Sequence, residues 1–226
     1  MSVLKQALTI AAKDLRTEIR TKETLNATLA FALTILLLFS FAFDPTAEMT
    51  REIAGGLLWL VFAFAAALIL NRAFARDQPN ECLELLLASP LHPTALFAGK
   101  ALASGVLLLA VEVVCLPVFG LFYNISWGPQ LRLLPAVMLL ATWGLAVVGA
   151  AFSALTVNLR LRELMLPMLL YPVMIPSLLA AIQLTTAIAN GSPLDASAQV
   201  WFRLLAGFDL IYTLLAIALI EPVLIG

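Results

Sequence analysis

Few side chains of this sequence have the types and spacing that covalent or metal chemistry requires. The chain holds two cysteines, Cys82 and Cys115, and one histidine, His92. There is no C-x-x-C pair, so the ligands of a protein-only zinc site and of a covalently attached haem are both lacking. We therefore expect no catalytic residue, no metal ligand and no cofactor bound by this chain.

A phosphate-binding loop is also incomplete. Gly99-Lys100 resembles the end of such a loop, but Thr94 stands where the first glycine is needed and Ala101 where Ser or Thr is needed. If the chain uses ATP, we expect another polypeptide to bind it.

Glu112 is an acidic side chain at the middle of an apolar segment. A carboxylate at the centre of a bilayer costs on the order of 3 kcal/mol, so we expect it to face other helices or water. It could contact a proton or substrate along a pathway, or be a protonated carboxyl hydrogen-bonded between helices; we favour the second. Asp209 and Glu221 are expected nearer the ends of the last apolar segment, where the membrane interface accounts for them.

A charged segment from Asn71 to Lys100 separates two long apolar runs. Asp77 can serve as the N-cap of a short helix, Pro79 is tolerated in its first turn, and Ser89-Pro90 ends it. Such a helix along the membrane interface is usually offered to a partner. The residues that we expect on this docking surface are Arg76, Asp77, Glu81, Cys82, Glu84, Leu85 and Ser89.

A second interfacial helix is predicted from Val3 to Glu23. Its apolar side chains, Leu4, Leu8, Leu15 and Ile19, fall on one side, as in a helix that lies in the membrane plane. It could be a simple basic anchor, or an elbow helix that frames the docking surface together with residues 76–88. The candidate residues of the elbow helix are Lys13, Asp14, Arg16 and Arg20.

The composition sets the fold class. The chain is 62% hydrophobic and 12% charged, with a mean hydropathy of +1.02, whereas soluble domains carry roughly 25% charge. This predicts an all-α, polytopic membrane protein, and no basic block suggests nucleic acid. Because a membrane-spanning helix needs about 20 apolar residues, we expect one transmembrane domain with six spans, at Leu25–Phe43, Ile53–Leu70, Ala101–Phe122, Leu133–Val157, Leu164–Ala189 and Leu204–Leu224.

The distribution of Lys and Arg predicts the orientation. Ten of these residues fall on the side of the two termini, from residues 1–24, 71–100 and 158–163, and three, Arg51, Arg132 and Arg203, on the other. Because basic loops stay in the cytoplasm, both termini are expected there.

The fifth span is unusual because Pro167, Pro172 and Pro176 lie within ten residues. Each proline removes a backbone hydrogen bond, which lipid tolerates only where protein or a cavity covers the free carbonyl. Two interpretations remain open: residues 177–202 re-enter the outer leaflet as a short helical pair, or the prolines merely bend a continuous helix.

Three stretches of the sequence resemble one known family. They are K-D-L-R-T-E-I-R-T-K-E-T-L-N (Lys13–Asn26), F-A-R-D-Q-P-N-E-C-L-E-L-L-L-A-S-P (Phe74–Pro90) and L-R-E-L-M-L-P-M-L-L-Y-P-V-M-I-P (Leu161–Pro176). Their order, the length and the six spans are similar to those of the haem exporter protein B (CcmB) family, the membrane subunit of the cytochrome c maturation ABC transporter. The resemblance covers nearly all of the chain.

The resemblance implies an ABC-2 type exporter half-transporter in the bacterial inner membrane. It implies a homodimer with two copies of the ATPase subunit CcmA, which would bind ATP and Mg²⁺, and association with CcmC, CcmD and the haem chaperone CcmE. Haem would be handled by these partners, and ATP hydrolysis would release the haem-loaded chaperone. In that arrangement residues 76–88 match the coupling helix that docks on the ATPase.

Two other functions are weighed against this one. A passive scaffold of the haem-handling complex would still support cytochrome c maturation when the ATPase is inactive. A proton-driven secondary transporter would use Glu112 as its carrier site and would lose transport in Glu112→Gln.

Overall fold

The protein is all-helical in a computed structural model, which describes residues 2–43, 48–78, 85–86, 90–125, 129–191 and 196–225. Within these ranges no strand occurs, so the predicted fold class is confirmed. The elements are α1 (Val3–Thr21), α2 (Glu23–Ala42), α3 (Glu48–Ala73), the 3-10 helix η1 (Ala75–Asp77), α5 (Pro93–Phe122), the 3-10 helix η3 (Pro129–Leu133), α6 (Leu134–Thr156), α7 (Arg162–Ala189) and α8 (Ala196–Ile225).

Six helical stretches of the described residues are long and apolar enough to cross a membrane, as predicted. Most of them extend beyond the predicted ends. The third span begins at Pro93 rather than Ala101, because a proline at the first position of a helix has a preset φ and leaves no needed N–H unpaired. This extension places Lys100 inside a helix.

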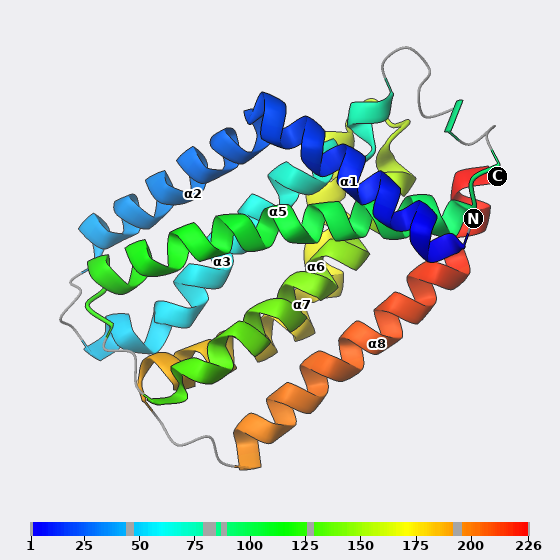
Figure 1. The fold of residues 1–226 in the computed structure, drawn as a ribbon. Helices are drawn as coiled ribbons and strands as arrows, with labels where there is room; N and C mark the ends of the chain where they lie inside the picture. The colour runs from blue at the N-terminus through cyan, green and yellow to red at the C-terminus, as the bar shows by residue number, and fades with distance from the viewer. Residues whose placement is uncertain are drawn as a thin grey trace.

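The two N-terminal helices meet at a corner, and α1 lies on the outside of the bundle against α5 (Figure 1). Lys22 makes the corner: its φ of 53° is left-handed, and its N–H donates to the Glu18 carbonyl at the end of α1. A left-handed residue commonly ends a helix in this way. The chain then starts α2 in a new direction at Glu23.

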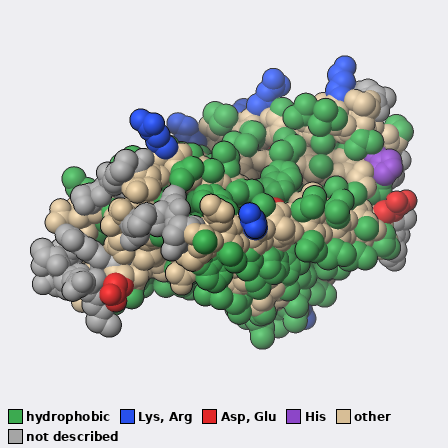
Figure 2. Space-filling model, turned by 90° about the horizontal axis from the view of Figure 1, so that it is seen from below, with side chains coloured by type: hydrophobic (Ala, Val, Ile, Leu, Met, Phe, Trp, Pro, Cys, Tyr) green, Lys and Arg blue, Asp and Glu red, His purple; other side chains and the backbone are tan. Residues whose placement is uncertain are grey.

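The centre of the bundle is formed by α3 and α6. In the most apolar stretch of each helix, 72% of the residues are buried in α3 and 67% in α6. The corresponding values are 17% for α2 and 22% for α8. Hydrophobic side chains cover most of the face seen in Figure 2, as expected of a surface that meets lipid. Small and hydroxyl residues bring the central helices together: the Ser153 hydroxyl of α6 donates to the Leu70 carbonyl of α3 at 2.8 Å.

The interpretation of residues 177–202 as a re-entrant helical pair is wrong. The helix α7 runs through Pro167, Pro172 and Pro176 to Ala189, and α8 begins at Ala196. Beside the prolines, the Tyr212 hydroxyl of α8 donates to the Val173 carbonyl at 3.3 Å. The prolines are therefore accommodated within one continuous helix.

The expected position of Asp209 near a membrane interface is also wrong. Because α8 begins at Ala196, eight residues before the predicted span, Asp209 lies about 20 Å along the helix. Its side chain is buried against α6, where a Cβ added at Gly144 would lie 2.7 Å from its Oδ1. Glu221, by contrast, lies in the last turns of α8 and is exposed.

The close packing of α3 on α7 gives a testable consequence. A Cβ at Gly55 would lie 2.8 Å from the Ile182 carbonyl oxygen, whereas a Cβ at Gly56 would meet nothing within 4 Å. We expect Gly55→Ala to destabilise the protein by about 1–3 kcal/mol, because the helices must separate. The apparent midpoint of thermal unfolding in detergent should fall by several degrees, while Gly56→Ala, its neighbour on α3, should change it little. Equal midpoints for the two variants would contradict this packing.

Candidate functional site

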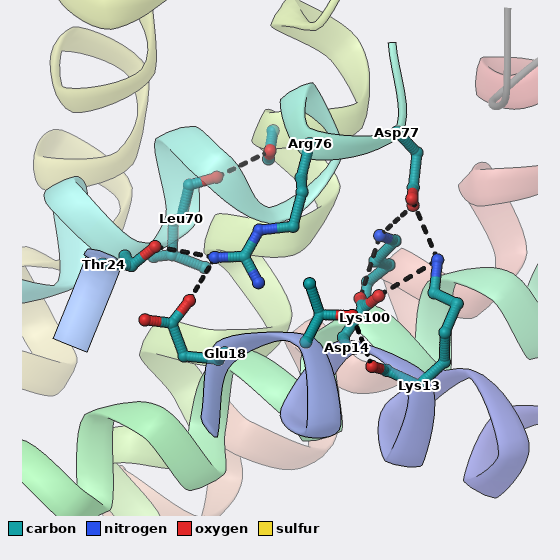
Figure 3. Close-up of polar contacts among 10 residues, drawn as sticks. Lys13, Asp14, Glu18, Thr24, Leu70, Arg76, Asp77 and Lys100 are labelled. Atoms are coloured by element: carbon teal, nitrogen blue, oxygen red, sulfur yellow. Dashed lines mark hydrogen bonds and ion pairs between the residues drawn. The ribbon is translucent and has the colours of Figure 1, made fainter. Parts of the chain in front are cut away.

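A cluster of charges, most of them buried, lies at one end of the bundle, where α1 packs against the first part of α5 and near η1, which follows α3 (Figure 3). We call it the ion network. It joins three residues of α1, one of α2, two of η1 and one of α5: Lys13, Asp14, Glu18, Thr24, Arg76, Asp77 and Lys100.

In the first part of the ion network, each of two lysines contacts the same two aspartates. The Lys100 Nζ contacts Asp14 Oδ2 at 2.9 Å and also pairs with Asp77. The Lys13 Nζ contacts Asp77 Oδ1 at 2.9 Å and Asp14 Oδ1 at 3.1 Å. Lys100 is 1% exposed, so its charge must be balanced inside the protein. The two aspartates supply that balance and connect α1, η1 and α5.

The second part is built around Glu18, which is fully buried. Its carboxylate pairs with Arg76 and accepts a hydrogen bond from the Leu25 backbone N–H at 2.8 Å. The same Arg76 guanidinium donates to the Thr24 hydroxyl at 2.7 Å. Glu18 thus fastens both sides of the α1–α2 corner to η1.

The network shifts the pKa of two α1 residues, Glu18 and Lys13. Burial alone would raise the pKa of Glu18, but the hydrogen bonds from Leu25, Arg76 and Thr24 outweigh burial and lower it. Burial alone would lower the pKa of Lys13, but the hydrogen bond to Asp77 and the charge of Asp14 raise it overall. Both shifts stabilise the charged forms of Glu18 and Lys13.

Further contacts tie the next residues of the chain to α6 and α7. The Gln78 side-chain amide donates to the Val157 carbonyl at 2.7 Å, and Arg162, the first residue of α7, donates to the Gln78 side-chain oxygen. Near the start of α1, the Gln6 side-chain amide donates to the Pro90 carbonyl at 3.3 Å. The two ends of the segment between α3 and α5 are therefore held by α1, α6 and α7.

The predicted docking residues are only partly within the described structure. Arg76 and Asp77 belong to the ion network, and the Leu85 side chain is 67% exposed. Both Asp77 oxygens accept from lysines; the helix that it was expected to cap lies outside the described residues. Outside them, too, lie Glu81, Cys82, Glu84 and Ser89.

The predicted elbow residues divide into two groups. Lys13 and Asp14 belong to the ion network, whereas Arg16 and Arg20 are exposed. The leucines that the sequence places on the apolar side, among them Leu4 and Leu8, face outward. The side packed against the protein instead carries small and acidic residues: Ala7, Ile10, Ala11, Asp14 and Glu18.

Sequence reasoning missed Glu18 and Lys100 as members of the site. A signal existed for each: Ala7, Ala11, Asp14 and Glu18 follow one another at the spacing of a helix face, and Lys100 stands beside Gly99 at the start of an apolar run. A Cβ at Gly99 would lie 2.8 Å from the Ala7 carbonyl oxygen. The absent side chain lets α1 rest directly on α5, which brings Asp14 within reach of Lys100.

Glu112 lies apart from the ion network, within the span formed by α5. It is 2% exposed, and its Oε1 accepts a hydrogen bond from the Thr142 hydroxyl of α6 at 2.6 Å. No group of three or more His, Cys, Asp or Glu in the described ranges is placed to hold a metal ion.

The balance of charge in the ion network can be tested by removing one lysine. Lys100→Met should leave Asp14 and Asp77 with Lys13 alone and destabilise the protein by about 3–5 kcal/mol, because an unpaired carboxylate stays buried. Removing Asp77 as well, in Lys100→Met/Asp77→Asn, should recover part of the loss, since the Lys13–Asp14 pair remains. Thermal unfolding in detergent measures both, with the exposed Lys5→Gln as control. A double variant less stable than the single one would refute the network.

The lowered pKa of Glu18 predicts a dependence on pH. A carboxylate with a lowered pKa in the folded protein stabilises it fully above its ordinary pKa of 4.5, and the contribution is lost as pH falls through the lower folded value. Between pH 6 and the lowest pH that the detergent complex tolerates, the unfolding midpoint of wild type should therefore fall more steeply than that of Glu18→Gln. The exposed Glu23→Gln should keep the wild-type slope. Parallel profiles for wild type and Glu18→Gln would rule out this role.

The sequence matches one family and several of its members. The model of the family described as CcmB protein matches residues 5–223. The chain is 33% identical over 186 residues to heme exporter protein B of Rhodobacter capsulatus, which covers 82% of this chain and 85% of that protein. It is 35% identical to the Paracoccus denitrificans protein of the same name (74% and 76% covered) and 30% identical to that of Pseudomonas aeruginosa (92% and 93%). With its six apolar helices, this chain is a multi-pass membrane protein that belongs to the CcmB protein family.

Proposed function

We propose that this chain is the membrane subunit of an ATP-driven haem-export complex that serves cytochrome c assembly. Its relatives carry the name heme exporter protein B. In this proposal a separate ATPase subunit, CcmA, binds ATP and Mg²⁺, and CcmC, CcmD and the chaperone CcmE handle haem. This chain contributes no catalytic residue of its own and transmits the work of the ATPase to its partners.

The observation that carries the proposal is the ion network at the start of the proposed coupling segment, residues 76–88. Arg76 and Asp77 are held by Glu18, Lys13 and Lys100, from two different helices. A force applied to this segment would therefore move α1 and α5 with it. ATP can shift membrane helices only if the two states differ in such contacts.

The charges at the end of the protein that holds the ion network also indicate which side of the membrane this end faces. Ten of the thirteen Lys and Arg residues belong to residues 1–24, 71–100 and 158–163, the segments that supply the ion network and the α6–α7 connection. Because basic segments remain in the cytoplasm, we propose that this end and both termini lie there, in the bacterial inner membrane. The ATPase would then have direct access to the coupling segment. Two copies of each subunit would form the complete motor.

A passive scaffold is the main alternative, and one variant distinguishes the two. In the reconstituted complex, Arg76→Gln should still capture the ATPase but should reduce the release of haem-loaded chaperone per ATP by about tenfold, within the range of coupling between sites. Arg76→Lys should recover part of it, because a positive charge still faces Glu18. Lys5→Gln, an exposed change on α1, should behave as wild type.

Three measurements read the outcome: ATP turnover, chaperone release and the unfolding midpoint of each variant. If Arg76→Gln matches Lys5→Gln at an equal midpoint, the coupling role of the ion network is wrong. If chaperone release proceeds equally well without this chain, or with an inactive ATPase, the proposed function itself is wrong and a scaffold remains.

A further inference from the structure

Two cavities adjoin each other at the ion-network end of the protein, and both are lined by arginines. The larger, of about 790 Å³, lies between the α1–α2 corner, the end of α3 and the start of α7, with Arg72, Arg76 and Arg162 in its wall. The second, of about 670 Å³, lies along the α6–α7 connection and includes Arg160 and Arg162. Because they share Arg162, we treat the two as one cationic cavity.

The charge of this cavity is not fully balanced. Arg76 pairs with Glu18, and Arg72 contacts Glu23 at 2.7 Å. Glu163 also lines both cavities. Arg160 and Arg162 make no ion pair with any carboxylate that the structure describes. Four arginines thus face three acids, which leaves a surplus of one positive charge.

An apolar groove of about 310 Å³ lies between the same two helices, α3 and α7, deeper in the membrane. Its lining is wholly apolar in surface and includes Gly56, Leu60 and Phe64 of α3 and Tyr171 and Ile175 of α7. Gly56 opens its far end, since a Cβ there would meet nothing within 4 Å.

The cationic cavity and the apolar groove lie along one seam. On α3, residues 56, 60, 64, 68 and 72 are spaced four apart, so each is the surface neighbour of the next along one ridge that winds gradually around the helix; Leu68 and Arg72 line the cavity, and the first three line the groove. On α7 the exposed Met168 lies between Leu164 of the cavity and Tyr171 of the groove. From Leu68 to Gly56 the helix rises about 18 Å, close to the depth of half a bilayer, about 15 Å.

We propose that this seam is a binding site for an anionic phospholipid of the membrane leaflet on the α1 side. The phosphate lies at Arg160 and Arg162, and one acyl chain follows the groove between α3 and α7. Arginine forks suit phosphate oxygens, and basic pockets at the ends of membrane helices are suited to acidic headgroups. The surplus of one positive charge matches the single negative charge of a phosphodiester. The site stands on the geometry of this chain alone and needs neither the ATPase nor haem.

The headgroup is tested on the full chain, purified in a neutral detergent, with binding measured by native mass spectrometry. Dioleoyl phosphatidylglycerol should bind at least about tenfold more tightly than dioleoyl phosphatidylcholine, which has the same chains and no net charge. Arg160→Gln/Arg162→Gln should lose about tenfold in affinity for the anionic lipid only. Arg132→Gln/Arg203→Gln, which removes two exposed arginines elsewhere, should bind it as wild type does. Because Arg162 also contacts Gln78, Arg160→Gln alone provides a second variant, with a smaller loss expected.

The acyl chain is tested with Gly56→Leu, which fills the far end of the groove. It should weaken the binding of dioleoyl phosphatidylglycerol several-fold and leave that of dihexanoyl phosphatidylglycerol unchanged, since six-carbon chains do not reach Gly56. Equal binding of the anionic and neutral lipids, or wild-type binding by both arginine variants, would overturn the site. So would inorganic phosphate competing as well as the lipid does.

Two further outcomes would assign the seam to a protein instead of a lipid. If the arginine variants lose capture of the ATPase while lipid binding is unchanged, the cationic cavity belongs to that interface. If Gly56→Leu dissociates a dimer of the chain while lipid binding is unchanged, a second copy covers the groove. Either result would overturn the lipid site.

Discussion

A buried positive charge must be balanced inside the protein, and this constraint determines how the helices are arranged at one end of the molecule. Lys100 lies within a membrane-spanning helix at 1% exposure, and it cannot be left unpaired there without a large cost. Its partners, Asp14 and Asp77, come from α1 and η1. The position of α1 on the bundle, and the path of the chain after α3, are therefore set by the same ion network.

In the rest of the bundle, hydrophobicity alone does not determine which helix faces pack together. Apolar side chains gain nothing from facing one another rather than lipid, so helices associate through close packing and a few polar contacts. Gly99 beneath α1 and Gly55 beneath α7 permit that close approach. The polar contacts, such as Ser153 to the Leu70 carbonyl, then fix how the helices are aligned. The ion network and a few hydrogen bonds from hydroxyl groups thus determine the helix pairing and alignment that hydrophobicity alone does not determine.

Sequence reasoning succeeded where the signal was local. The six spans depend on runs of apolar residues, and the structure places a helix at each of them. Sequence reasoning failed where the exact end of a helix mattered. Because the last span was predicted to start at Leu204 instead of Ala196, Asp209 was expected near an interface, although Asp209 lies well inside the helix. In α1 the sequence periodicity is compatible with two packing faces, one of leucines and one of small and acidic residues. The leucines were taken as the defining face, but the small and acidic face packs against the protein.

The amino-acid sequence by itself determined the class of the protein, its six spans and its family, because these depend on composition, on runs of hydrophobic residues and on short motifs. Only the tertiary structure decided which charges are partners, since Lys13 and Asp77 are 64 residues apart and each could have remained at the membrane surface. It also decided that α3 and α7 lie side by side with a cationic cavity above an apolar groove. Burial removes water as an alternative partner, so the pairing of a charge depends on what packs around it, which no local pattern specifies.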